Sequence, residues 1–79
     1  MTDAEIYQQL TEIFYDIFDD PTIVLKPETS AADIPEWTSF IHVNIVVATE
    51  LKFQIKFSTA EIERLKSVGE LVALIRSKR

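Results

Sequence analysis

Apolar residues recur along this chain mainly at the spacing of an α-helix. Between positions 6 and 18 they stand three or four residues apart, which places them on one helix face. This stripe consists of Ile6, Leu10, Ile13, Phe14, Ile17 and Phe18. Thr2 and Glu5 have the spacing of a capping box, which satisfies two backbone N–H groups at a helix start. The pattern therefore predicts a first helix that begins near Thr2 and ends at the "DDP" of positions 19–21.

Prolines interrupt the next segment, positions 21–37. Pro21, Pro27 and Pro35 remove backbone donors, so we expect a long loop without regular helix. A loop of this length in a small domain is usually functional or is held by its own side chains. The expected anchors are the apolar residues Ile23, Leu25, Ile34 and Trp37.

A second helix is predicted to begin at Thr38 or Ser39 and to run to about Phe53. The residues expected to face inward are Val43, Val46, Val47 and Phe53. The many β-branched residues of this segment lower helix propensity and would also suit a strand. Its apolar positions do not alternate strictly, however, and this favours the helix.

Two more helices are predicted in the last third of the chain. The segment "FQIKFS", positions 53–58, alternates like a short extended piece, and Ser58 and Glu61 then have capping-box spacing. Ser67 and Glu70 repeat that spacing before a last helix. This helix carries Leu71, Leu74 and Ile75 on one face and Arg76, Lys78 and Arg79 at its C-terminal end. We therefore predict an all-α fold of one domain, residues 1–79, with three main helices and a short third one.

Composition narrows the function classes. A chain of 79 residues with 47% hydrophobic residues and one glycine is typical of one folded domain. The absence of cysteine excludes disulfides, thiolate metal sites and a cysteine nucleophile. No spacing of His or carboxylate residues predicts a metal site. Because there is neither a signal-peptide pattern nor an apolar run of membrane-spanning length, we expect a soluble cytoplasmic protein.

Charge is distributed unevenly. The net charge of −5 argues against a nucleic-acid partner, because phosphate binding needs clustered Lys and Arg. Residues 1–39 hold nine acids and one Lys, and residues 40–79 hold four acids and seven bases, which gives −8 and +3. The acidic half suggests attraction to a basic partner surface. A well-solvated helix surface is the simpler interpretation of the same charges.

Ser39 is the clearest candidate for a residue that takes part in chemistry. It stands three positions before His42, so the pair could be read as a nucleophile and its base. No third group to orient the base is evident, and so small a domain offers little concave surface, so we predict no intrinsic enzyme activity. A phosphate attached to Ser39 would instead be favoured by the partial positive charge of a helix N-terminus. The simplest alternative is that Ser39 or Thr38 only caps the helix, worth about 1 kcal/mol.

Residues 32–75, "ADIPEWTSFIHVNIVVATELKFQIKFSTAEIERLKSVGELVALI", resemble the second half of an acyl carrier protein. Members of that family carry an acidic residue, a Ser and an apolar residue at the start of the second helix, where this chain has "WTSF". The positions that follow in the pattern are Val43, Val46, Ala48, Glu50 and Phe53, and "SVGELVALI" resembles the family's last helix. The resemblance implies a four-helix bundle of the acyl-carrier type.

The resemblance also implies a function. Ser39 would receive 4'-phosphopantetheine from coenzyme A through a separate, magnesium-dependent phosphopantetheinyl transferase. Acyl groups would then be carried as thioesters to acyl-transferring or acyl-activating enzymes, and fatty acyl, β-hydroxyacyl, aminoacyl and polyketide groups all remain open as cargo. The implied lining of an acyl pocket is Ile45, Val47, Thr49, Ile62 and Val68, each of which could equally be ordinary core. Gly69, the only glycine, would permit close helix approach near the arm.

The chain departs from the family pattern where partners are expected to bind. Thr38 replaces the usual Asp, and Asn44 and Lys52 stand at positions that are often acidic, which leaves Glu36 and Glu50 as the nearby acids. We expect partner contact through Glu36, Thr38, Phe40, Ile41 and Glu50, unless Phe40 and Ile41 are buried against Trp37. The alternative function is a carrier-like interaction module that never receives the arm, because Thr38 replaces Asp. In either case we expect a monomer.

Overall fold

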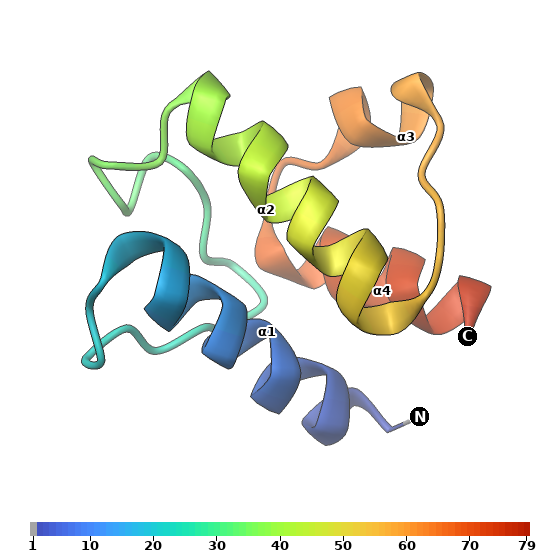
Figure 1. The fold of residues 1–79 in the computed structure, drawn as a ribbon, viewed down its shortest axis with the longest axis horizontal. Helices are drawn as coiled ribbons and strands as arrows, with labels where there is room; N and C mark the ends of the chain where they lie inside the picture. Colours follow the sequence, from blue (N-terminus) through green and yellow to red (C-terminus); the bar gives the residue numbers. More distant parts are fainter. Residues whose placement is uncertain (1) are drawn as a thin grey trace.

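The computed structural model describes residues 2–79 and is all-α, as the sequence predicts. The helices are α1 (Asp3–Phe18), α2 (Ser39–Phe53), α3 (Thr59–Arg64) and α4 (Val68–Lys78). Figure 1 shows α2 in front of α4 and α1 at the lower left, with most of the long α1–α2 connection on the side of the molecule away from both termini. Within residues 2–79, no helix is long and apolar enough to cross a membrane.

The predicted starts of the helices and the predicted ends of α1 and α2 are confirmed, and side chains satisfy the helix starts. Thr2 and Ser58 form complete capping boxes with Glu5 and Glu61, at the beginnings of α1 and α3. Ser67 accepts a hydrogen bond from the backbone N–H of Glu70 at the start of α4. The helices α1 and α2 both end at a residue in the left-handed conformation, Asp19 with φ 51° and Gln54 with φ 57°.

The buried face of α2 differs from the predicted one. Val46 and Phe53 are buried as expected, but Val43 is 56% and Val47 is 47% exposed. The inward positions are instead Ile45, Thr49 and Phe53, which stand four residues apart with Val46 beside them. The prediction was wrong for Val43 and Val47 because α2 is apolar nearly all the way round, so its periodicity does not identify one face.

The segment after α2 extends along the core. Ile55 and Phe57 are buried while Gln54 and Lys56 are exposed, which confirms the alternation predicted for this extended segment. In α4 the buried residues are Val68, Leu71, Val72 and Ile75, whereas Leu74 is half-buried. Together with α1, these side chains form one hydrophobic core.

The long connection is packed against the helices by all four predicted anchors, Ile23, Leu25, Ile34 and Trp37. Its backbone also docks onto α4: the N–H of Val68 donates to the carbonyl of Thr29 at 2.8 Å, and that of Gly69 donates to Pro27 at 2.9 Å. A Cβ at position 69 would lie 2.8 Å from the Pro27 carbonyl oxygen. The close approach expected at Gly69 is therefore real, but it involves this loop rather than a second helix.

Candidate functional site

The junction between the long loop and α2 assigns different roles to Thr38 and Ser39. Thr38 is the N-cap: its hydroxyl accepts from the N–H of Ile41 at 3.3 Å, and its carbonyl accepts from the N–H of His42 at 2.8 Å. Ser39 is the first helical residue and is exposed. Because Thr38 provides the cap, the Ser39 hydroxyl has no capping role and remains accessible.

The start of α2 is electrostatically suited to an anionic group. An α-helix carries roughly half a positive charge at its N-terminus, and acidic side chains often compensate it. The first turns of α1, α3 and α4 contain Asp or Glu, but the first turn of α2 contains none. An anion attached at Ser39 would therefore supply the charge that this helix start lacks.

A surface groove of about 390 Å³ begins at Ser39 and runs between the start of α2 and α3. Its lining residues are Ala31, Trp37, Thr38, Ser39, His42, Val43, Ile62, Glu63 and Leu65. Most of these side chains are apolar, and Glu63 is the charged one among them. The groove therefore offers an apolar surface directly beside an accessible hydroxyl.

The imidazole of His42 is engaged with Trp37 rather than with Ser39. The indole Nε1–H of Trp37 donates to Nδ1 of His42 at 3.1 Å, and the two rings stack with centroids 5.9 Å apart. This arrangement does not form the nucleophile–base–orienting group constellation of a hydrolase. Within residues 2–79 there is also no group of three or more His, Asp or Glu residues placed to hold a metal ion.

The residues predicted to line an acyl pocket lie in three different environments. Ile45, Thr49 and Val68 belong to the buried interior, where the Thr49 hydroxyl donates to the carbonyl of Ile45 at 2.7 Å. Ile62 is half-buried and lines the groove that begins at Ser39. Val47 is exposed beside Leu51 and Gln54, away from the other four. Only Ile62 of the set shares a cavity with Ser39.

The residues predicted to contact partners also differ in their exposure to solvent. Glu36, Thr38 and Phe40 are exposed, and Phe40 is 76% exposed as expected of a contact residue, which rules out the alternative that it is buried against Trp37. Ile41 is half-buried and packs against the core. Glu50 is half-buried, and its Oε2 accepts the backbone N–H of Phe57 at 2.8 Å, which holds the α2–α3 connection.

Sequence reasoning missed an apolar stripe on the outer face of α2. Phe40, Val43, Val47 and Leu51 are all between 47% and 76% exposed. Their spacing of three or four residues places them on one face of the helix, and this spacing could have revealed the stripe. It also missed Leu65 and Glu63 in the groove, which lie within one turn of Ile62.

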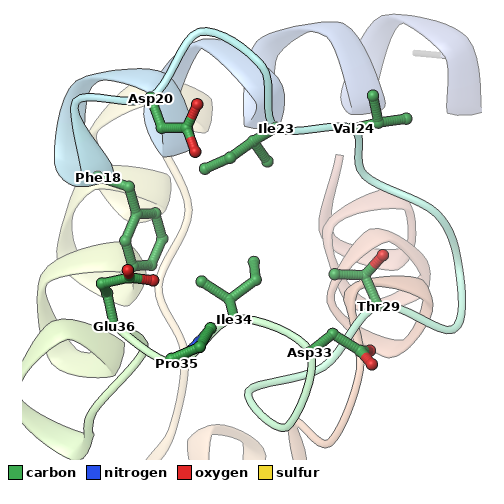
Figure 2. A pocket seen from close by; sticks show the side chains of 9 residues that line it. All are labelled: Phe18, Asp20, Ile23, Val24, Thr29, Asp33, Ile34, Pro35 and Glu36. Carbon is green, nitrogen blue, oxygen red and sulfur yellow. The ribbon is translucent and has the colours of Figure 1, made fainter.

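A second hollow, of about 310 Å³, lies between the end of α1 and the long loop. Figure 2 shows the apolar side chains of Ile23 and Ile34 pointing into it, with the carboxylates of Asp20 and Asp33 at its edge. Both carboxylates hold the loop: Asp20 accepts from Thr22, which lowers the pKa of Asp20, and Asp33 accepts from Ser30. This hollow is therefore accounted for by the packing of the loop.

Comparison with known proteins identifies the family, although no protein-family profile matches the chain. An acyl carrier protein from Acidothermus cellulolyticus is 35% identical over 75 residues, which cover 95% of this chain and 89% of that protein. The solution structure of a holo acyl carrier protein from Geobacter metallireducens superposes with a TM-score of 0.86 at 46% identity, covering 91% of this chain and 83% of that one. This chain belongs to the acyl carrier protein family.

Proposed function

We propose that this acyl carrier protein holds its 4'-phosphopantetheine arm on Ser39. One observation carries the assignment: Thr38 caps α2, which leaves the Ser39 hydroxyl exposed at a helix start that lacks a first-turn acid. The phosphodiester formed there would place its negative charge at the positive end of the helix. The groove beside Ser39 provides an apolar surface along which the arm can lie.

The bound arm supplies the thiol that this cysteine-free chain lacks, and acyl groups are held on it as thioesters. The protein's own part is to present the cargo and to shield it from water. An acyl chain that enters the groove would first contact Ile62 and Leu65. The residues farther inside are Ile45, Thr49 and Val68. The six-residue helix α3 has no fully buried side chain, so it is the element that can most easily yield to an acyl chain.

Partner enzymes, the phosphopantetheinyl transferase among them, would dock on the exposed apolar stripe of α2. This stripe, Phe40, Val43, Val47 and Leu51, begins directly beside Ser39. The two charged residues of α2 are both engaged within the chain, Glu50 with the N–H of Phe57 and Lys52 with Glu12 at 2.8 Å. The fitting partner surface is therefore an apolar depression beside the enzyme's active-site entrance, with Glu36, Thr38, Ile41 and Glu50 at the margin of the contact.

The protein would work as a cytoplasmic monomer. Both Ser39 and the α2 stripe are exposed in a single copy, so no second copy is needed to complete the site. An enzyme must reach both features at once, and self-association through the stripe would cover the surface next to the attachment residue.

Intact-protein mass tests the attachment. The purified protein is incubated with coenzyme A, magnesium and a broad-specificity phosphopantetheinyl transferase. We expect a gain of one phosphopantetheinyl group, and no gain in Ser39→Ala. Ser58→Ala is the matched control, because Ser58 is also an exposed serine at a helix start, and this variant should still be modified. A gain seen only after Thr38→Asp would instead support the unmodified interaction module.

A further inference from the structure

The hydrogen bond between Trp37 and His42 selects one tautomer of the neutral imidazole. An indole nitrogen can only donate, so Nδ1 of His42, which receives the Nε1–H of Trp37 at 3.1 Å, must be unprotonated. The proton of the neutral ring is then on Nε2, at the other side of the imidazole. The pair therefore fixes one tautomer, and its Nε2–H has no hydrogen-bond partner within the described residues 2–79.

Trp37 is itself held by the core, which makes it a rigid support for His42. Its ring meets the fully buried ring of Phe14 edge-on, with centroids 5.4 Å apart and planes at 83°. Its backbone N–H donates to the carbonyl of Ile34 at 3.0 Å. Because the His42 ring also stacks on Trp37 at 23°, both a hydrogen bond and ring contact restrain it.

His42 and Ser39 lie on the same face of α2 and line the same groove. Residues three apart in a helix have Cβ atoms about 5–6 Å apart, so an imidazole donor can reach a group attached to the serine. The charged side chain that lines this groove is that of Glu63, which comes from α3. Toward α1, the Trp37 ring meets the uncharged ring of Phe14.

We propose that His42 is a positioning residue for the prosthetic group, an inference that rests on attachment at Ser39. Its Nε2–H donates a hydrogen bond to a non-bridging oxygen of the phosphodiester, while Trp37 fixes the tautomer. This contact directs the arm into the groove, toward Ile62 and Leu65, rather than into solvent. The direction of the arm then depends on the core, because the core holds Trp37 and Trp37 orients His42. His42 in turn contacts the group attached to Ser39.

Nuclear magnetic resonance of the modified protein tests this proposal. Phosphorus shifts of the starting protein and its variants are compared at one fixed pH. We expect His42→Phe, whose ring cannot donate a hydrogen bond, to move the phosphorus resonance, and Ser77→Ala, on α4 outside the groove, to leave it unchanged. The same phosphorus shift in the starting protein and in His42→Phe would overturn the role of His42.

A second measurement does not depend on the arm. In the unmodified protein at about pH 8, imidazole nitrogen shifts should show Nδ1 as an acceptor and Nε2 as protonated, and Trp37→Phe should remove this preference. The opposite tautomer in the starting protein would contradict the proposal. A phosphorus resonance that never appears, with unchanged mass, would instead overturn attachment at Ser39 and the inference that rests on it.

Discussion

Gly69 lets the long loop lie close to α4, because glycine has no side chain. A Cβ there would lie 2.8 Å from the carbonyl oxygen of Pro27 and 3.2 Å from its Cα, and backbone atoms cannot move aside cheaply. We expect Gly69→Ala to lower the free energy of unfolding by about 1–3 kcal/mol, as overpacking does. The cost of overpacking is expected to outweigh the gain of about 1 kcal/mol that alanine brings to a helix.

Urea denaturation checks this expectation, with Ser77→Ala as the control, since Ser77 is exposed on the same helix. The control should change stability by less than about 0.5 kcal/mol. If Gly69→Ala were more stable than the starting protein, the loop would not be fixed on α4 by this close approach.

Single residues differ in how well the sequence predicts their roles. Thr2, Ser58 and Ser67 were identified as caps because capping follows a fixed local spacing. Either Thr38 or Ser39 could have capped α2, and only backbone geometry decides between them. The Trp37–His42 hydrogen bond follows no such spacing rule, because the indole is placed by Phe14, which is distant in the sequence.

The capping boxes of α1 and α3 make helix stability depend on pH. The pKa of Glu5 is lowered by the backbone N–H of Thr2 and then by its hydroxyl, and the pKa of Glu61 by the N–H of Ser58 and then by Lys78. In the unfolded chain a glutamate titrates near about pH 4.3, so the unfolded state takes up these protons first. The stabilisation is therefore present above about pH 4.3 and is lost as pH falls through the lower folded pKa values.

Thermal melts between about pH 6 and pH 3 test this dependence. A Glu5→Gln, Glu61→Gln variant keeps side chains that can complete a capping box but cannot titrate, so its melting temperature should fall less steeply below about pH 4.3. Glu63→Gln is the control, because Glu63 lies on α3 outside the box, and it should follow the starting protein. Parallel curves for all three proteins would show that the two boxes contribute nothing to acid unfolding.

The exposed stripe of α2 predicts a particular mode of partner recognition. We expect Phe40→Ser to weaken binding to the phosphopantetheinyl transferase about tenfold or more, because burial of an aromatic side chain contributes roughly 1.5–3 kcal/mol. Affinity should change little between about 0.05 and 0.5 M salt, since screening acts on charges and not on apolar contact. Fluorescence anisotropy of the labelled carrier measures both effects.

Val24→Ser is the matched control for the stripe. Val24 is 71% exposed, like Phe40, but it lies in the long loop, so its replacement should leave the affinity unchanged. Equal losses in both variants, or binding that disappears at high salt, would mean that partners use the acidic loop instead of α2.

The sequence predicts the positions of the helices better than it predicts which face of each helix is buried. The starts of the four helices follow from capping residues and the end of α1 follows from the "DDP" breaker, and these are local signals. The inward face of α2 does not, because a helix that presents apolar groups to both the core and a partner has no single hydrophobic side. The groove at Ser39 could not be predicted either, since it forms between α2 and α3 and the loop that carries Trp37.

At the scale of the whole molecule, repulsion and attraction between charges compete. Residues 1–39 carry −8 and residues 40–79 carry +3. Among residues 2–79, two ion pairs join these halves, Arg76 with Asp3 and Lys52 with Glu12, each at 2.8 Å. All four side chains are at least 36% exposed, so each pair is expected to contribute about 0–1 kcal/mol. More acidic side chains lie outside these two pairs than within them, and most of those outside are on α1 and the long loop.

Added sodium chloride should therefore raise the melting temperature, because it screens the repulsion among many acids more than it weakens two exposed pairs. A net gain of about 1 kcal/mol would raise it by roughly 4–8 °C in a domain of this size. An Asp16→Asn, Asp19→Asn variant should melt higher at low salt and gain less from salt, and asparagine tolerates the left-handed conformation at position 19. A melting temperature that falls with salt would show that the pairs between the halves outweigh the repulsion within the first. An unchanged one would mean that water already screens these acids.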